Sequence, residues 1–592
     1  MKKITLIFLL TYSTFCFSQN FIEGYIIDKT TNESLPYATI KLISNVPNYT
    51  ITNGDGKFEI NSKLSTDSLE VRFLGFQTKK VPISFFEKNI KFYLSPNINT
   101  LNTVLVVAKT DKNYTYNLLN SLIQKYREKK TRTKNKGFLV LTSSVKNIPI
   151  EIVEGFYNNE QNLSKGIINL DVKNGRFGQN TSFPFYSLNN TDILKDFQLF
   201  KRSSQILPLY PGNMTLSSIK GKYIVKINDC SFCSSQDLSI SFIPKKNNGR
   251  LFMGKIIFNK ETLTIKKIEL RITDPETKGL TSIIQKDIIT PKDIKLDINF
   301  NPNDYEKIQT INFEFVMYYK SEENFEIINS HTFLYLYDYN KPFEDPYFTN
   351  NINFNNDYDK IIALQASDKF WDSNYQFPKS FVDKKSINFL KKYGYLINYQ
   401  NKIPSSYIEY LNPSVISWNK DQKINWESIK LDVLKEKKVK DHKHHQEGHT
   451  IVADGTSDSP TELKKRKNSL RYDKKFNFSY LLDEYYDRNG NRHFITRTLF
   501  NRNSSFYSNS RSKNRLDYLN LIFDIYEIFK RQLDAEITTE MSFEDAKILC
   551  DKKFNEASIT VLKMEKQTNS GSNYQNLAKW NKSIKGKLTT QN

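Results

Sequence analysis

The sequence contains few of the residues that reveal a chemistry. Only four cysteines, four tryptophans and six histidines occur in 592 residues. The serine-hydrolase pattern Gly-x-Ser-x-Gly, the phosphate-binding pattern Gly-x-x-x-x-Gly-Lys-Ser/Thr and the zinc pattern His-Glu-x-x-His do not occur in the chain. We therefore predict no catalytic, cofactor-binding or metal-binding residues from sequence motifs.

Long apolar runs are also lacking. Residues 1–18 are predicted to be a secretory signal, because Lys2 and Lys3 precede a short apolar run and small residues stand just before Gln19. A lipid anchor on Cys16 is the alternative, although Phe15 stands where a small residue is usual. No later segment approaches the roughly 20 apolar residues of a membrane helix. We expect an exported protein, periplasmic or associated with the outer membrane, with no transmembrane segment once the signal is removed.

Acidic residues are outnumbered by basic ones. The net charge is +22, while 38% of the residues are hydrophobic and 14% are aromatic. Phe and Tyr bury large areas, so the chain has enough apolar surface for several cores. Outside the cytoplasm the expected partners of a basic protein are envelope lipids, glycans or outer-membrane proteins, and not nucleic acid. A solvated basic surface without a specific partner is the simpler interpretation.

The cysteines predict at most one disulfide. Cys230 and Cys233 form a Cys-x-x-Cys pattern between two stretches that are typical of strands. A redox-active pair usually opens a helix, where the helix N-terminus lowers the thiol pKa. A local disulfide at a hairpin tip is therefore favoured over an oxidoreductase site. A zinc site with four ligands would need a second pair of cysteines.

Residues 20–108 are predicted to form a small antiparallel β-sandwich. Apolar and polar residues alternate over 38–42 and again over 69–73, as expected for strands with one buried face. Asn53-Gly54-Asp55-Gly56 lies between two such stretches. It predicts a tight turn, because Gly and Asn tolerate a positive φ.

A family resemblance rests on a set of glycine, aromatic and polar positions in this same region. These positions are Gly24-x-x-x-Asp28, Pro36 with Ala38, Asn53-x-x-Gly56-x-Phe58-x-Ile60 and Gly75-Phe76. The region resembles the carboxypeptidase regulatory-like domain, a transthyretin-like sandwich common in exported proteins of Bacteroidetes. The resemblance implies a non-catalytic accessory domain and no peptidase activity.

The middle of the chain is predicted to be a helix followed by one large curved sheet. Leucine and isoleucine spacing predicts an amphipathic helix within 112–132, and strand-like stretches fill 135–340. Residues 254–270 predict a hairpin with an Asn259–Thr262 turn. This hairpin is similar to those of half-barrel lipoprotein carriers and to the non-barrel part of outer-membrane proteins that carry the same N-terminal domain. This second resemblance rests on one hairpin and on domain order.

The last third is predicted to hold three further regions. Residues 341–415 have a helical pattern, and residues 416–475 are rich in charge and poor in apolar residues, as expected for a linker. Residues 476–592 are predicted to form an α+β unit that begins with a hairpin around Asp487–Gly490. The predicted fold class is multidomain, β-rich α+β.

The last third contains histidine and acidic residues that could be catalytic, but a structural role or no role is the favoured interpretation for them. His444 and Glu447 have the His-x-x-Glu spacing of zinc carboxypeptidase ligands, but they lie in the predicted linker, which gives no rigid support. Asp524 and Glu527 lie on one predicted helix, near Glu536 and Glu540, and Glu527 is expected to pair with Arg531.

Three aromatic residues could form a sugar-binding surface. Phe370, Trp371 and Trp580 are the side chains on which a sugar ring would stack. Interior packing is the favoured role for each of them.

Two functional hypotheses follow. The first is a non-enzymatic envelope protein that uses the sandwich for docking and binds a lipid, a glycan or an envelope protein. The second is a cell-surface hydrolase of peptide or glycan, with its site within 476–592. The first expects an apolar groove along the sheet, and the second expects acidic or histidine side chains around a polar cleft.

Overall fold

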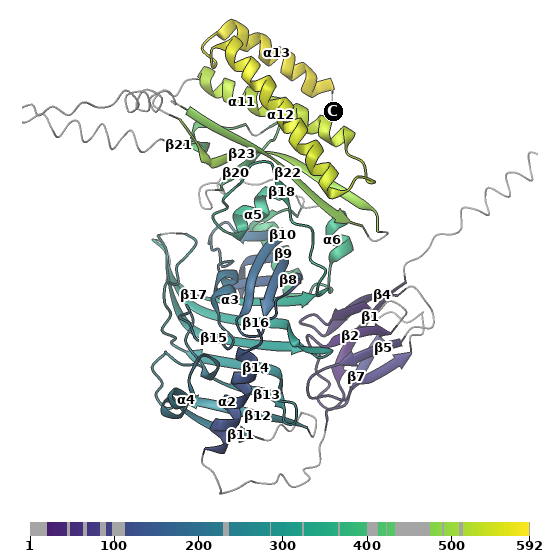
Figure 1. The fold of residues 1–592 in the computed structure, drawn as a ribbon, viewed down its shortest axis with the longest axis vertical. Helices are drawn as coiled ribbons and strands as arrows, with labels where there is room; N and C mark the ends of the chain where they lie inside the picture. Colours follow the sequence, from purple (N-terminus) through teal and green to yellow (C-terminus); the bar gives the residue numbers. More distant parts are fainter. Residues whose placement is uncertain are drawn as a thin grey trace, which may run out of the picture.

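The structure is a computed structural model. It describes residues 20–43, 48–62, 68–82, 90–97, 113–228, 236–284, 286–322, 325–364, 368–399, 413–421, 423–431, 474–487, 490–507 and 513–590. These residues form two small N-terminal sheets, an antiparallel sheet of 11 strands, and a C-terminal unit with helices on a small sheet (Figure 1). The predicted β-rich α+β fold class is confirmed.

The two small sheets face each other at the N-terminus. Ile26, Ile40 and Phe58, which come from both sheets, belong to one buried cluster. The pair β1–β7 is parallel, whereas the sequence predicted an antiparallel sandwich. Alternation reports which face of a strand is buried and carries no information about the direction of the neighbouring strand. The sheets have the orders β4-β1-β7 and β3-β2-β5-β6, from β1 (Asn20–Asp28), β2 (Thr39–Ile43), β3 (Asn48–Ile51), β4 (Lys57–Ser62), β5 (Ser68–Arg72), β6 (Lys79–Pro82) and β7 (Ile90–Leu94).

The predicted turn at residues 53–56 carries the chain from one small sheet to the other. The Asn53 side-chain oxygen accepts hydrogen bonds from the backbone N–H groups of Asp55 and Lys57, both at 2.9 Å. Gly56 has φ +74°, and a Cβ there would lie 2.9 Å from the Cβ of Ser34. Glycine is therefore required at this position for both conformation and space.

The large sheet places strands side by side that are distant in sequence. Its order is β11-β12-β13-β14-β15-β16-β17-β8-β9-β10-β19, so β17 pairs with β8 near the centre. The predicted hairpin at 254–270 is the pair β13–β14. The strands are β8 (Thr133–Val145), β9 (Ile148–Asn162), β10 (Gly166–Asn180), β11 (Tyr223–Asn228), β12 (Asp237–Pro244), β13 (Met253–Asn259), β14 (Thr264–Thr273), β15 (Ile288–Asn301), β16 (Asp304–Lys320), β17 (Phe325–Tyr337) and β19 (Gly394–Ile397).

One face of the large sheet, here called the inner face, is covered by the chain's own helices. Leu122 and Ile123 of the first helix are fully buried in the same cluster as Leu296 and Phe313 of the strands. This cluster is the main core of the protein. The helical segments on this side are α2 (Tyr114–Arg127), α3 (Asn190–Asp196), η1 (Pro211–Asn213) and α4 (Leu216–Lys222).

The opposite, outer face of β8, β9 and β17 is also covered. Phe138 and Phe156 pack there with Trp371 and other aromatic residues that follow β17 in the sequence. Because both faces are covered, β9 is buried along most of its length. The covering segments include α6 (Asp368–Asn374) and α7 (Phe381–Tyr393). The helix α5 (Asp357–Ala363) lies on the inner face instead, where Tyr358 and Ile361 belong to the main core.

The N-terminal sandwich rests on this outer face. The ring of Tyr37 stacks on Phe333 of β17, with ring centroids 3.9 Å apart. The Thr50 hydroxyl donates a hydrogen bond to the Gln376 carbonyl at 2.7 Å, and the Asn53 side-chain amide donates to the Pro378 carbonyl at 2.9 Å. The sandwich is thus joined to the sheet by an aromatic stack and by hydrogen bonds to the segment between α6 and α7.

A long hairpin forms the base of the C-terminal unit. β22 and β23 pair antiparallel, and Gly490 in the connection has φ +84°, which agrees with the predicted hairpin. Phe478 and Phe500 of the hairpin pack against Phe523 of the first of three covering helices. The elements are β18 (Tyr347–Phe348), β20 (Val415–Ser417), η2 (Trp426–Ser428), β21 (Lys430–Leu431), β22 (Lys474–Tyr486), β23 (Arg492–Tyr507), α11 (Lys513–Glu536), α12 (Phe543–Thr568) and α13 (Tyr574–Thr590).

Two predicted regions contain more regular structure than expected. The segment 341–415 holds three short helices but also β18 and β19, which join different sheets. Residues 416–431, assigned to the start of the charged linker, include most of β20 and all of β21, and both strands pair with β23. Charge density over the whole 416–475 window hid these short strands, whose stability comes from pairing with β23.

Several predictions fall on residues outside the described part of the chain. These are the signal at 1–18, the Cys230–Cys233 disulfide and the histidines from His442 to His449. Among the described residues, no helix combines the length and the apolar character that crossing a bilayer requires.

The aromatic stack between the sandwich and the sheet gives a first prediction. Phe381 N–H donates to the Asp55 side chain at 2.6 Å, so its exchange with solvent reports on this contact. We expect Tyr37→Ala to accelerate amide hydrogen exchange over residues 376–381 by about fivefold, the equivalent of an aromatic pair worth about 1 kcal/mol. Tyr37→Phe keeps the ring and is the control, measured by exchange mass spectrometry. Equal exchange in all three proteins would show that the stack does not hold the sandwich.

Candidate functional site

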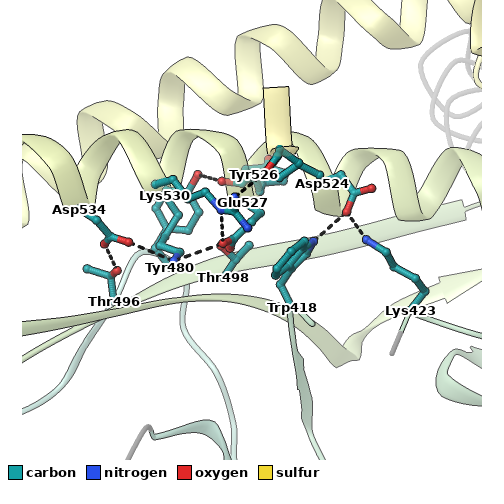
Figure 2. Close-up of polar contacts among 12 residues, drawn as sticks. Trp418, Lys423, Tyr480, Thr496, Thr498, Asp524, Tyr526, Glu527, Lys530 and Asp534 are labelled. Atoms are coloured by element: carbon teal, nitrogen blue, oxygen red, sulfur yellow. Dashed lines mark hydrogen bonds and ion pairs between the residues drawn. The ribbon is translucent and has the colours of Figure 1, made fainter. Parts of the chain in front are cut away.

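The row of acidic side chains on α11 is the first candidate site, because the sequence placed Asp524 and Glu527 on one helix. In the structure α11 lies across the β22–β23 hairpin, and Asp524, Glu527 and Asp534 point toward the sheet (Figure 2). Asp524 and Glu527 are buried, whereas Asp534 is partly exposed. The three side chains form a row along the interface between helix and sheet.

Glu527 sits at the centre of this row and is surrounded by donors. One of its carboxylate oxygens accepts a hydrogen bond from the Thr498 hydroxyl at 2.8 Å. The other oxygen accepts from the Arg531 guanidinium at 3.1 Å and lies 3.3 Å from the Lys530 ammonium. The predicted Glu527–Arg531 pair is therefore confirmed, and two cations of the same helix neutralise this carboxylate.

The other two carboxylates of the row are engaged in the same way. The Trp418 indole N–H donates to Asp524 at 2.7 Å, and Lys423 forms an ion pair with the same carboxylate. Asp534 accepts a hydrogen bond from Thr496 and pairs with Lys530 at 3.1 Å. Each of the three acids thus contacts at least one side chain outside α11. Together these contacts hold α11 on the small sheet.

The two remaining acids of the predicted set lie elsewhere. Glu536 forms an ion pair with Lys553 of α12 at 2.5 Å, and Glu540 is exposed in the connection between the helices. They do not join Asp524 and Glu527 in one site. The hydrolase hypothesis needs carboxylates that face a substrate, and the acids of α11 face partners within the chain.

A second candidate site lies on β9 and was not predicted. Glu154 projects to the outer face, where it accepts hydrogen bonds from Arg176 at 2.7 Å and from Tyr399 at 2.6 Å. Lys379 lies 3.4 Å away. Burial alone would raise the pKa of Glu154, but the charges of Arg176 and Lys379 outweigh burial and lower the pKa to about 2.

Aromatic rings enclose the cation of this pair. The Arg176 guanidinium lies over the rings of Trp371 and Tyr399, with its central carbon 3.8 Å and 4.5 Å from the two ring centroids. Trp371 and its neighbour Phe370 are only 3% and 2% exposed. The expected packing role of both residues agrees with this burial, and Trp371 in addition stabilises a buried charge.

Glu151 lies three residues earlier on the same strand and projects to the inner face. It accepts hydrogen bonds from Ser143 at 3.0 Å, from the Gln179 side chain at 2.9 Å and from Tyr358 and Ser187. Among the described residues no Lys, Arg or His lies within ion-pair distance of this carboxyl group. Burial raises the pKa of Glu151, and the hydrogen bonds offset only part of that effect.

Side chains alternate across a strand, so an odd spacing places two residues on opposite faces. Glu151 and Glu154 are three residues apart within Ile150–Phe156, which is otherwise rich in apolar residues. Two acids in such a stretch are the signal that sequence reasoning passed over. It would have indicated two buried carboxyl groups in different environments.

A buried ion pair joins the large sheet to the C-terminal unit. Lys173 of β10 pairs with Asp483 of β22, and both side chains are almost fully buried. The same ammonium donates to the backbone carbonyls of Glu344 at 2.6 Å and Glu484 at 3.0 Å. Breaking a buried pair of this kind is costly, because the remaining charge has no partner.

The other singled-out residues have structural contacts. Trp580 is partly buried on α13, and its indole N–H donates to the Gln567 side chain at 2.8 Å. His493 contacts Asp487 at 3.0 Å and stacks on Tyr485. Among the described residues, no group of three or more His, Cys, Asp or Glu is arranged to hold a metal ion.

Comparison with known proteins assigns the N-terminal domain. Residues 22–106 match the family model of the CarboxypepD_reg-like domain, which agrees with the predicted resemblance over 20–108. The match ends before the large sheet, so the resemblance of that sheet to carrier and outer-membrane proteins stays a prediction. A search of the curated proteins found no match.

Two solved structures show a distant likeness. One is the complex structure of Pseudomonas aeruginosa MucA/MucB, at 8% identity and a TM-score of 0.13, covering 37% of this chain and 93% of the other. The second is the crystal structure of MucB in complex with MucA(peri), at 7% identity and a TM-score of 0.14, with the same coverage. Scores this low give no basis for a functional comparison.

The row of acids on α11 gives a second prediction. We expect Glu527→Gln to lower the free energy of unfolding of the C-terminal unit by about 2 kcal/mol, because a buried charged hydrogen-bond acceptor is lost. Glu540→Gln changes an exposed acid and should leave stability unchanged. Urea unfolding followed by tryptophan fluorescence measures both variants, since Trp418 contacts Asp524 in this row. If Glu527→Gln is as stable as the wild type, the row of acids does not stabilise the packing of α11 on the small sheet.

The two glutamates of β9 give a third prediction, with pH dependences of opposite sign. The folded-state pKa of Glu154 is about 2, below its ordinary value of 4.5, so its stabilising contribution is complete above about pH 4.5 and is lost toward pH 2. The folded-state pKa of Glu151 is raised above 4.5, so its contribution is complete below about pH 4.5 and declines as the pH rises through the folded-state value.

The variants Glu154→Gln and Glu151→Gln separate these cases. We expect Glu154→Gln to be less stable than the wild type by about 3 kcal/mol at pH 7, with the deficit shrinking below about pH 4.5. For Glu151→Gln, the stability relative to the wild type should instead increase as the pH rises from 4.5. Urea unfolding of the three proteins between pH 3 and 8 tests this, and parallel trends for the two variants would contradict the assignment.

Proposed function

We propose that this protein is a non-enzymatic, exported envelope protein that uses its N-terminal sandwich as an accessory module and binds a lipid, a glycan or another envelope protein. The observation that carries the proposal is the seating of the CarboxypepD_reg-like domain on the outer face of the large sheet. A domain held by the Tyr37–Phe333 stack and by hydrogen bonds from the Thr50 and Asn53 side chains to backbone carbonyls acts as a fixed brace for the sheet.

The acidic side chains of α11 form ion pairs within the chain, which supports a binding function rather than a hydrolase function. Glycoside hydrolysis needs two carboxyl groups that flank a substrate bond, one of them free to donate a proton. In this chain Asp524 and Glu527 are held by Lys423, Lys530 and Arg531. The hydrolase alternative would require these ion pairs to open.

The chain's own helices cover the inner face of the sheet, which changes where a ligand is expected to bind. A groove for a lipid chain was expected along the sheet, but the strand side chains on that face pack on α2 and on the segments around α3 and α4. A ligand or partner is therefore better placed on surfaces outside this core. The envelope location rests on the predicted signal at residues 1–18 and on the family of the sandwich.

Cell fractionation tests the location, which is the fourth prediction. We expect the mature chain to begin at Gln19 and to appear in the periplasmic or outer-membrane fraction, because the signal is removed during export. Mass spectrometry of the intact purified protein gives the N-terminus. Cys16→Ala is the control, since it should leave processing unchanged unless Cys16 carries a lipid. An unprocessed chain in the cytosol would overturn the proposal.

A further inference from the structure

The outer surface of α12 exposes apolar side chains that a soluble helix normally covers. Ile548, Ile559 and Leu562 are 68%, 67% and 56% exposed. Their spacing of 11 and 3 residues places them on one stripe of the helix, opposite the stripe that packs on α11. Lys552 and Lys566 lie on the same stripe and are also exposed. Glu544 is exposed at the N-terminal end of the stripe and is paired with Lys547 at 2.7 Å. From Ile548 onward the stripe combines apolar and positively charged groups.

The neighbouring helix α13 has a related surface. Leu577 and Ile584 are buried and hold α13 on the C-terminal unit. Lys579, Lys582 and Lys585 are exposed on its other sides. Residues 561–590 contain six lysines and one acidic residue, Glu565. This end of the chain is thus strongly basic, while its apolar anchors are directed inward.

These lysines differ from other lysines of the same unit in their contacts. Lys530 and Lys553 each form ion pairs with acidic residues. Within the described part of the chain, no ion pair involves Lys566, Lys579 or Lys582. The charge of this surface is therefore free to interact with an external anion.

The position of the two helices makes the surface accessible. Figure 1 shows α11, α12 and α13 on the side of the β22–β23 hairpin that faces away from the large sheet, at one end of the molecule. An apolar stripe flanked by exposed lysines is the arrangement by which helices bind the interface of a bilayer that contains anionic lipids. The apolar side chains enter the headgroup region, and the ammonium groups lie beside lipid phosphates.

We propose that the exposed surfaces of α12 and α13 bind an anionic lipid membrane. This inference rests on the proposed function, because it selects the lipid among the expected partners of an exported protein. A nucleic acid is less well matched, since isoleucine and leucine side chains offer no stacking surface for bases. A protein partner is an alternative outcome of the test.

Vesicle flotation of the mature full-length chain tests the inference, which is the fifth prediction. The vesicles contain phosphatidylethanolamine and phosphatidylglycerol at three to one, with pure phosphatidylcholine as the neutral comparison. We expect binding to the anionic vesicles in 0.15 M salt. The triple variant Lys579→Gln, Lys582→Gln, Lys585→Gln should bind about a hundredfold more weakly, since each lysine near an anionic surface contributes about fivefold.

A charge-matched control lies on another helix. Lys384, Lys385 and Lys391 of α7 are exposed, and replacing all three with Gln removes the same charge. Because salt screens charges beyond about 8 Å at this ionic strength, that variant should bind like the wild type. Equal loss of binding in both triple variants would overturn the assignment to α12 and α13, since it would show attraction by net charge alone.

The apolar stripe is tested separately. Ile559→Ser with Leu562→Ser should weaken binding by about tenfold, and the remaining binding should disappear at high salt, because only the charges would still act. Circular dichroism confirms that the helices are intact. Binding unaffected by either change would overturn the inference, as would equal binding to neutral vesicles or capture of a protein with no vesicle binding. If the chain is processed and exported but does not bind vesicles, this inference fails and the proposed function stands. If the chain is unprocessed and cytosolic, the proposed function fails, regardless of the vesicle result.

Discussion

The burial of β9 on both faces is the constraint on which the rest of the structure depends. A strand covered on both sides cannot leave a polar group without a partner. Glu151 on the inner face is satisfied by Tyr358, and Glu154 on the outer face by Arg176 and Tyr399. Tyr358 and Tyr399 both follow β17 in the sequence and lie on either side of β19, the last strand of the large sheet. Their hydrogen bonds fix the path of the connecting segment around β9.

The same logic links the C-terminal unit to the large sheet. Lys173 and Asp483 form a buried ion pair, and Arg497 donates to the carbonyls of Ile362 and Ala363. Burial lowers the pKa of Arg497 to about 10. Buried charged groups therefore act at this joint together with apolar side chains, because Leu481 and Leu499 of the C-terminal hairpin also belong to the main core. Such joints favour one relative arrangement, because a displaced partner leaves a charge unpaired.

Local features could be predicted from the sequence, but pairing between distant strands could not. The turn at Asn53–Gly56 and the hairpin at Asp487–Gly490 depend on residues that tolerate a positive φ, so they are visible in a few letters. The stripe of α11 and the Glu527–Arg531 pair follow from helical spacing. The neighbours of β17 and β10 depend on tertiary packing, and Glu151 and Glu154 acquire their environments only there. The short strands β20 and β21 were missed because their stability comes from β23.

The order of strands in the large sheet has a consequence for how the protein is made. Ser143 of β8 and Ser330 of β17 are hydrogen-bonded although 187 residues separate them in the sequence. The centre of the sheet therefore stays open while the eight intervening strands, β9 to β16, are synthesised, and its apolar edges have no partner in that interval. A chain of this topology gains from reaching its destination before it folds, because early collapse of β8 to β10 would expose those edges to other molecules.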